Sequence, residues 1–152
     1  MKENPIKEEL LAYCKNQIDQ RYLKIKQTIQ DIEESLMEES KNTSGDKHET
    51  GRAMLQINRE NAGKQLLEIE KLMDILQKTD IKRESAYARL GSLVRTDKYN
   101  YFISLSVGAK KVDGVEYFCV ALNSPVGMQL SGKQKGDSFE FNNIKQQVLE
   151  VE

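Results

Sequence analysis

The sequence predicts an α+β protein in which an N-terminal antiparallel coiled-coil hairpin precedes a small β-rich domain. Two long segments, separated by one short break, carry apolar residues at alternating spacings of three and four, which is the pattern of a coiled-coil seam. After Gly91 this pattern gives way to runs of β-branched and aromatic residues, which favour strands. We therefore expect a hairpin domain at residues 1–80 and a β-rich domain at residues 81–152.

The first helix is expected from Pro5 to about Asn42. Proline suits the first turn of a helix, and no helix-breaking residue follows until the cluster Asn42-Thr43-Ser44-Gly45. The predicted seam of this helix is Ile18, Tyr22, Ile25, Ile29, Ile32 and Leu36. A second helix of similar length is expected from about Asp46 to Gln77.

The seam of the second helix continues the same spacing, with one polar position. Its predicted members are Leu55, Arg59, Ala62, Leu66, Ile69, Met73 and Leu76. A charged residue in a seam sets helix register at a cost in stability, which is the role we expect for Arg59. Because two seams pack on each other, we expect no pocket along the hairpin. Any residues with a chemical role are expected at its tip.

The second half of the sequence is predicted to form strands and one short helix. Strands are expected at residues 101–107 and 115–122, with a turn signal at Asp113-Gly114. Ser124-Pro125 is typical of a helix N-cap followed by proline, and Gly132 is expected to end that helix. A final strand pair is expected at residues 138–141 and 145–151.

Composition limits the classes of function. The net charge of −1 argues against a general affinity for free nucleic acid. The start lacks a signal-peptide pattern, and no apolar run is long enough to span a membrane, so a cytoplasmic protein is expected. Cys14 and Cys119 lie in different predicted domains, and we expect both to be buried free thiols.

The tip of the hairpin, Gly45-Asp46-Lys47-His48-Glu49-Thr50, carries two carboxylates three residues apart. Carboxylate oxygens are the ligands that Mg²⁺ prefers, and one or two suffice when a partner supplies the rest. The same Asp-x-x-Glu pattern is also a capping box, and one residue can perform both tasks. His48, the only histidine, is expected to be an exposed loop residue without a role.

Two segments resemble the Gre-type transcript cleavage factors of bacterial RNA polymerase. Gly45-Asp46-x-x-Glu49 resembles the Gly-Asp-x-x-Glu-Asn tip of that family. Asn123-Ser124-Pro125-Val126, followed by Leu130, Gly132-Lys133 and Gly136-Asp137, resembles its Asn-Ser-Pro-Ile…Leu-x-Gly-Lys-x-x-Gly-Asp segment. Both segments occur in the family's order, in a hairpin followed by a β-rich domain.

The resemblance implies an RNA polymerase-binding elongation factor with an FKBP-like C-terminal domain. Asp46 and Glu49 would help to hold a second Mg²⁺ in the polymerase active site, so that the polymerase hydrolyses the 3′ segment of backtracked RNA. Ser124 and Pro125 would lie in the region that docks on the polymerase. Alone, the chain is expected to be a monomer that binds no metal, has no enzymatic activity, and meets RNA only through the polymerase.

The sequence departs from the family next to the tip. Thr50 replaces the family's asparagine, and Arg52 and Ala53 stand where acidic and aromatic residues are usual; Gly127-Met128 replaces Ala-Arg after the second motif. These changes motivate an alternative, a Gre-fold regulator that occupies the polymerase secondary channel without stimulating cleavage. Two further alternatives are a peptidyl-prolyl isomerase and a coiled-coil adaptor.

Two other groups of residues have an alternative functional interpretation. The basic residues Lys15, Arg21, Lys24 and Lys26 could follow RNA phosphates, but a solvated flank of the coiled coil is the commoner arrangement. The aromatic residues Tyr101, Phe102, Tyr117 and Phe118 could line a ligand pocket, but we expect one of each adjacent pair to face a hydrophobic core.

Overall fold

The computed structural model describes residues 3–41 and 46–152, and the side chains of residues 46–50 lie outside that description. The chain divides into two compact units. The hairpin unit is Ile18–Leu72, and the sheet unit comprises Met1–Gln17 together with Met73–Glu152. Helices α1 (Pro5–Lys41) and α2 (Asp46–Lys78) each contribute to both units. Their bounds agree with the predicted helices to within one residue.

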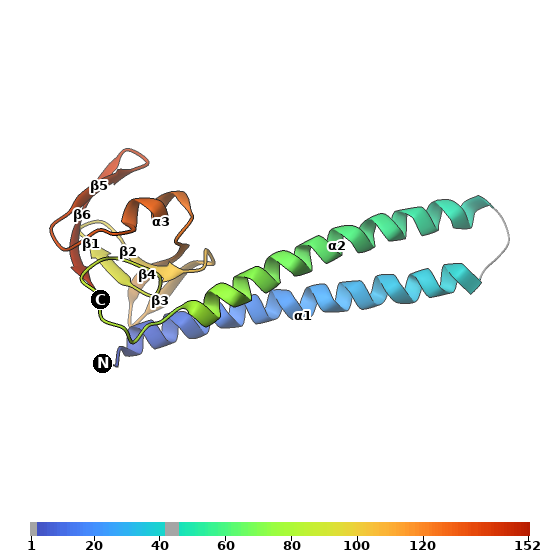
Figure 1. Ribbon diagram of the computed structural model, residues 1–152, viewed down its shortest axis with the longest axis horizontal. Coiled ribbons are helices and arrows are strands. Elements are labelled where there is room, and N and C mark those ends of the chain that lie inside the picture. Colours follow the sequence, from blue (N-terminus) through green and yellow to red (C-terminus); the bar gives the residue numbers. More distant parts are fainter. Residues whose placement is uncertain (1–2, 42–45) are drawn as a thin grey trace. The chain divides into compact units, whose positions relative to one another are not determined.

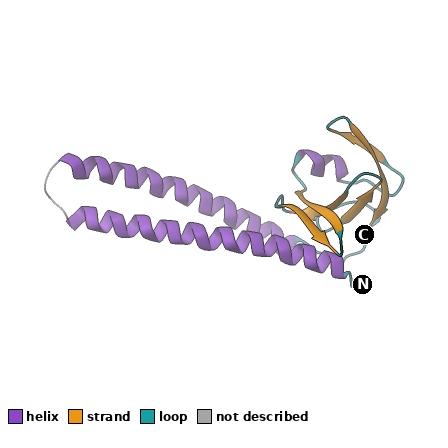
Figure 2. Cartoon of the chain, turned by 180° about the vertical axis from the view of Figure 1, so that it is seen from behind, coloured by secondary structure: helices purple, strands orange, loops and turns teal. Residues whose placement is uncertain are grey.

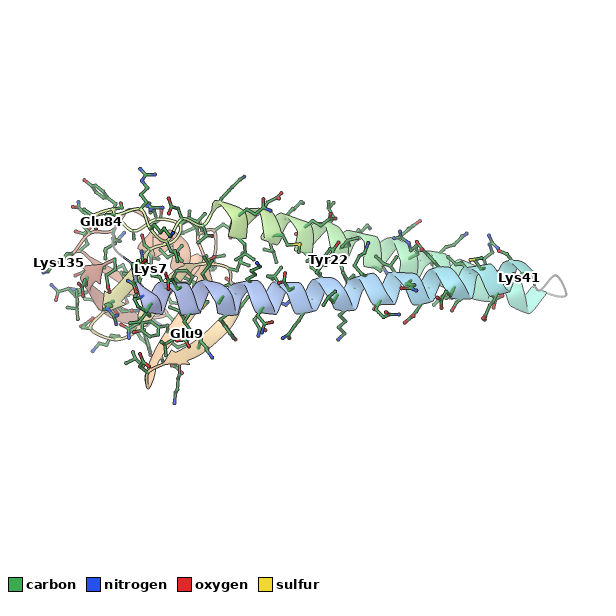
Figure 3. The ribbon with its side chains drawn as sticks, turned by 90° about the horizontal axis from the view of Figure 1, so that it is seen from below. Lys7, Glu9, Tyr22, Lys41, Glu84 and Lys135 are labelled. Atoms are coloured by element: carbon green, nitrogen blue, oxygen red, sulfur yellow. The ribbon has the colours of Figure 1, made fainter. Side chains whose placement is uncertain are left out.

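In the hairpin unit, α1 and α2 lie side by side and antiparallel (Figure 1). The core between them consists of the buried Ile25, Ile29 and Ala62, with Ile32, Leu66 and Ile69 packed against it. All six residues belong to the predicted seams, so the hairpin is confirmed. Many side chains project outward along both helices (Figure 3).

The sheet unit is built on six strands in the order β3-β4-β2-β1-β6-β5. Their bounds are β1 Leu93–Thr96, β2 Asn100–Ser104, β3 Gly108–Val112, β4 Val115–Ala121, β5 Ser138–Phe141 and β6 Ile144–Val151. The pair β2·β4 is parallel and the other pairs are antiparallel. Helix α3 (Pro125–Leu130) lies against one face of the sheet (Figure 2).

The structure adds two strands that the sequence did not predict, β1 and β3. The turn at Asp113-Gly114 joins β3 to β4, whereas β2, the predicted neighbour, pairs with β4 in parallel. Both turn residues have positive φ, 52° and 80°, as tight hairpin turns require. Strand β3 was missed because Lys110 and Lys111 interrupt its apolar pattern. The α+β class and the final strand pair are confirmed.

Each face of the sheet is covered by a hydrophobic core. On one face, Val94, Tyr101 and Ile103 pack with Val126 and Leu130 of α3. On the other, Leu93, Phe102 and Tyr117 pack with Leu10 and Cys14 at the start of α1. Neighbouring residues of a strand point to opposite faces, so both members of each aromatic pair enter a core. The prediction that one of each pair faces a core is confirmed, and the second member of each pair packs in or against the core on the opposite face.

The two cysteines share the second of these cores, although the sequence placed them in different predicted domains. Cys14 and Cys119 are free and buried, at 0% and 2% exposure, which confirms the expected state of both thiols. A hydrogen bond from the Cys119 thiol lowers the pKa of Cys14, and the same contact raises the pKa of Cys119. The start of α1 is thus part of the folded sheet unit.

Candidate functional site

The acidic pair of the tip lies in the first turns of α2. The helix begins at Asp46, so Asp46 and Glu49 are three residues apart on a helical backbone, and this spacing places them on one side of the helix. His48 lies within α2, so the prediction that it is a loop residue is wrong. The side chains of residues 46–50 lie outside the described part of the chain. The donor set of two carboxylates suits Mg²⁺, as the sequence predicted.

The residues next to the tip tie the two helices together. Arg52 donates a hydrogen bond from its guanidinium to the hydroxyl of Ser40 in α1. Gly51 faces Glu39 of α1, and an added Cβ would lie 3.5 Å from a carboxylate oxygen of Glu39. Arg52 therefore links the two helices three residues after Glu49 in the sequence.

The second predicted segment forms the N-terminus of α3 as expected. Ser124 is the N-cap: its hydroxyl accepts a hydrogen bond from the Gly127 backbone N–H at 3.1 Å and donates to the Ala121 carbonyl at 2.6 Å. Pro125 follows at the start of the helix and is exposed. Met128, three residues later on the same side of α3, is 63% exposed. This helix therefore presents an apolar surface beside the predicted docking residues.

The structure explains why residue 127 is a glycine. It is buried where α3 meets the end of β4, and an added Cβ would lie 1.9 Å from the Ala121 carbonyl oxygen and 2.9 Å from that of Leu122. No side chain fits there without movement of the backbone. Glycine at this position is therefore required by the close approach of α3 to the strand before it.

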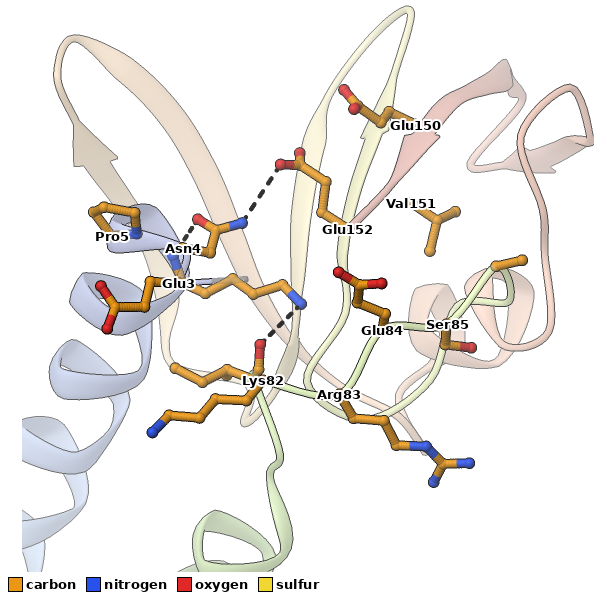
Figure 4. Close-up of a pocket in the computed structure, with 13 residues that line it drawn as sticks. Glu3, Asn4, Pro5, Lys82, Arg83, Glu84, Ser85, Glu150, Val151 and Glu152 are labelled. Atoms are coloured by element: carbon orange, nitrogen blue, oxygen red, sulfur yellow. Dashed lines mark hydrogen bonds between the residues drawn. The ribbon is translucent and has the colours of Figure 1, made fainter. Parts of the chain in front are cut away.

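A pocket of about 660 Å³ in the sheet unit was not predicted from the sequence. It lies between the N-terminus of α1, the connector at residues 81–86 and the end of β6 (Figure 4). Asn4 caps α1 by accepting from the Lys7 backbone N–H at 3.2 Å, and its amide donates to Glu152 at 3.4 Å. Glu152 in turn accepts from Arg95 Nε at 2.7 Å. These bonds tie the start of α1 to the end of the sheet.

Lys7 is the buried charge of this pocket. Its side chain is 3% exposed, and its ammonium donates to the Ile81 carbonyl at 3.4 Å. Burial is the main cause that lowers the pKa of Lys7, and the nearby Arg89 adds to it, while Glu152 and Asp80 act in the opposite direction. No sequence signal marks this lysine, because its burial depends on a connector more than seventy residues away.

The hairpin unit carries a groove of about 920 Å³ along its seam. The expectation of a hairpin without a pocket is therefore wrong. Its lining includes the small, buried Ala62 and the exposed, polar Asn58 and Asn61 of α2. Arg21 and Lys24, two of the four basic residues considered above, line this groove, whereas Lys15 and Lys26 do not.

The aromatic residues form no candidate ligand site. Tyr101, Phe102 and Tyr117 are at most 5% exposed, and Phe118 packs against the core beneath α3. The Tyr101 hydroxyl donates to the buried amide oxygen of Gln146 at 3.0 Å. These rings are packed in the interior of the sheet unit, as predicted for core residues.

Within the described residues, no cluster of three or more His, Cys, Asp or Glu side chains is placed to hold a metal ion. Likewise, none of the helices in the described ranges combines the length and the apolar character needed to cross a membrane. Compared with protein-family models, curated proteins and solved structures, the chain matches none.

Proposed function

We propose that the chain is a Gre-type elongation factor that binds RNA polymerase and stimulates the polymerase's own cleavage of backtracked RNA. The observation that carries this proposal is the position of Asp46 and Glu49 at the start of α2, beside the break of a long helical hairpin. At a rise of about 1.5 Å per residue, the 37 residues of α1 span about 55 Å. Such an arm can carry two carboxylates far into a channel of a larger enzyme.

In this proposal, Asp46 and Glu49 would supply oxygen ligands to a Mg²⁺ ion shared with the polymerase active site. The ion would orient a water molecule and stabilise negative charge during hydrolysis of the RNA. The chain's own contribution is positional: a helical backbone holds the two carboxylates on one side of α2. Residues of the chain alone would neither enclose the metal nor bind the RNA, so no independent nuclease activity is expected.

The sheet unit would provide the docking domain, with the FKBP-like fold that the resemblance implies. Support comes from α3, where the cap at Ser124 and the exposed Pro125 and Met128 form a rigid, partly apolar surface. Contiguous exposed apolar patches mark contact sites, and in this proposal Pro125 and Met128 would form part of one. The isomerase alternative is not retained, because the four candidate aromatic rings pack in the cores.

The alternative of a non-cleaving channel regulator is favoured by one observation. Arg52 lies three residues after Glu49 on α2, and its guanidinium donates a hydrogen bond to the Ser40 hydroxyl of α1. A guanidinium there would compete with Mg²⁺ for the carboxylate oxygens. The two proposals share the fold and the partner, and they differ in whether the RNA is shortened.

The deciding experiment uses stalled, backtracked elongation complexes with radiolabelled RNA, supplied with Mg²⁺. The variants are Asp46→Asn and Glu49→Gln, with His48→Ala as a control at the tip. Asparagine is still a good helix cap, so Asp46→Asn separates metal assistance from capping. We expect the wild type and His48→Ala to shorten the RNA, and both acid variants to bind the polymerase without shortening it.

Other outcomes of this experiment discriminate among the alternatives. If the wild type binds the complexes and leaves the RNA intact, the chain is a channel regulator. If nothing binds the polymerase, the Gre-type proposal is wrong. The docking surface is tested in parallel with Met128→Asp, which should weaken polymerase binding, and with the exposed neighbour Gln129→Asp as the matched control.

A further inference from the structure

The groove of the hairpin unit has an apolar floor and a polar rim. The floor consists of side chains from both helices that reach toward the seam: Ile25, Ile32, Ala62, Ile69 and Leu72. Polar side chains stand above it on either side, and they are Arg21, Lys24 and Thr28 of α1 and Asn58, Asn61, Lys64, Gln65 and Glu68 of α2. An apolar floor between polar rims is the form of a surface that receives an amphipathic segment.

The charge of this rim is positive in a chain whose net charge is −1. Arg21, Lys24 and Lys64 are exposed, and the described part of the chain provides no ion pair for any of them. Glu68, the acidic residue of the rim, is paired with Lys71 at 3.2 Å. The residues that line the groove therefore carry three positive charges without an ion pair and one negative charge, which lies in an exposed pair with Lys71.

Exposed apolar residues extend the floor along α2. Met54 and Ile57 are 56% and 52% exposed. Met54 precedes Asn58 by four residues and Asn61 by seven, and Ile57 precedes Lys64 by seven. These spacings place both apolar side chains on the side of α2 that lines the groove. A partner on this side would therefore find apolar surface beyond the groove itself.

A cross-helix ion pair bridges the seam without entering the groove. Arg59 donates to Glu33 at 3.1 Å, and neither residue lines the groove. The pair joins α1 to α2 at a position outside the groove and leaves the polar side chains of the rim unoccupied. The side of the seam that carries the groove has no such bridge among the described residues, and its cations face solvent.

We propose that this groove is a docking site for an acidic amphipathic helix of a partner protein. The groove extends from Asn58 to Leu72 on α2, about 21 Å, which corresponds to about 14 residues of a docked helix. One apolar stripe of that helix would cover the floor, and Asp or Glu residues beside the stripe would reach the three cations. RNA would satisfy the cations but leave the floor, Met54 and Ile57 uncovered. The proposal does not depend on the polymerase function.

The test uses the full chain and two fluorescein-labelled synthetic peptides of 16 residues. Both peptides carry leucine at i, i+3, i+4 and i+7, and they differ only in having glutamate or lysine at the flanking positions. Binding is followed by fluorescence anisotropy, with a single-stranded RNA of the same length as competitor. We expect saturable binding of the glutamate peptide, weakened by added salt, and no binding of the lysine peptide.

Two pairs of variants test the rim. Arg21→Glu with Lys24→Glu should weaken binding of the glutamate peptide by about tenfold or more. Lys15→Glu with Lys26→Glu makes the same change of charge on α1 at residues that do not line the groove, and it should leave binding within about twofold. All four side chains are exposed, so the fold of the chain should survive each change.

Two further pairs test the apolar surface. Met54→Ser with Ile57→Ser should weaken binding severalfold, whereas Leu23→Ser with Leu67→Ser should not. Leu23 and Leu67 are as exposed, at 68% and 54%, but they do not line the groove. The control pair therefore removes the same kind of surface from another side of the hairpin.

Several results would overturn the proposal. Equal binding of both peptides, or no charge-dependent binding, would remove the acidic helix as the occupant. Tighter binding of the RNA, unaffected by Met54→Ser with Ile57→Ser, would assign the groove to nucleic acid. Self-association in analytical ultracentrifugation that Arg21→Glu with Lys24→Glu abolishes would assign it to a second copy. None of these results affects the outcome of the cleavage assay, which measures RNA shortening and tests the role of Asp46 and Glu49.

Discussion

Arg59 of α2 and Glu33 of α1 form a hydrogen-bonded ion pair across the hairpin seam, with Nε and Oε1 3.1 Å apart. The side chains are 39% and 56% exposed, so the pair contributes little free energy by itself. Its effect is on alignment, because a charged residue in the seam disfavours other registers. Gly63 leaves room for it: a Cβ at that position would lie 3.2 Å from a terminal nitrogen of Arg59.

Gly63→Ala should stabilise the hairpin unit by up to about 1 kcal/mol, because alanine has the higher helix propensity. The nearest atom is the end of a flexible side chain, which can move by a few tenths of an ångström. Urea denaturation followed by far-UV circular dichroism measures the change. If Gly63→Ala destabilises the chain but Gly63→Ala in an Arg59→Ala background does not, Arg59 is held rigidly and this prediction is wrong.

Gly127→Ala should destabilise the sheet unit by about 3 kcal/mol or more, because its Cβ would overlap the Ala121 carbonyl. Gly132→Ala provides the control: Gly132 has φ of +77° with open space around its Cβ position, so alanine there should cost only about 1 kcal/mol of backbone strain. Thermal denaturation of both variants gives the comparison. Similar losses for both would show that α3 shifts freely on β4.

The hairpin could be predicted from the sequence because the pattern that specifies each helix lies within a short stretch of the chain. Seam residues such as Ile25 and Leu66 recur at fixed spacings, and a break at residues 42–45 fixes the antiparallel connection. The cap at Ser124 was equally local, since the hydroxyl bonds an N–H three residues away. The position of Asp46 and Glu49 in α2 followed from the same patterns, and the resemblance alone gave them a function.

The features that could not be predicted from the sequence depend on contacts between distant segments of the chain. The parallel pairing of β2 with β4 depends on β3, which intervenes in sequence and pairs with the other edge of β4, and no short motif records this arrangement. The burial of Lys7 depends on Ile81, and the groove of the hairpin unit depends on which small and polar side chains meet across the seam. Such arrangements follow from packing in three dimensions rather than from periodicity.

Lys7→Met should stabilise the chain at pH 7, and its advantage should shrink as the pH approaches 10.5. Burial and the charge of Arg89 lower the pKa of Lys7 below its value of 10.5 in the unfolded chain. Between these two pKa values the unfolded chain binds more protons, so the stability of the wild type rises with pH across this window. Below the window, the folded chain carries the full cost of a buried charge.

The test compares the denaturation midpoints of wild type and Lys7→Met at intervals from pH 7 to pH 10.5. It shows whether the stability advantage of Lys7→Met shrinks as the pH rises. Lys82→Met, at an exposed lysine of the same pocket, controls for the removal of a positive charge. A Lys7→Met variant that is less stable than wild type at pH 7, and recovers at higher pH, would contradict the prediction. Attraction of the ammonium to Glu152 and Asp80 would then outweigh its burial.

Arg95→Ala should cost about 2 kcal/mol of stability, far more than the loss of an exposed ion pair. Arg95 donates to Glu152 at 2.7 Å and to the Tyr117 hydroxyl at 3.1 Å, and its guanidinium lies 5.4 Å from the centre of the Tyr117 ring. Its side chain is 26% exposed, whereas Lys71, paired with Glu68 in the hairpin unit, is 61% exposed. Lys71→Ala should therefore change stability by less than about 0.5 kcal/mol. Urea denaturation at low and at high salt compares the two, and equal losses would show that the contacts of Arg95 to Glu152 and Tyr117 add nothing.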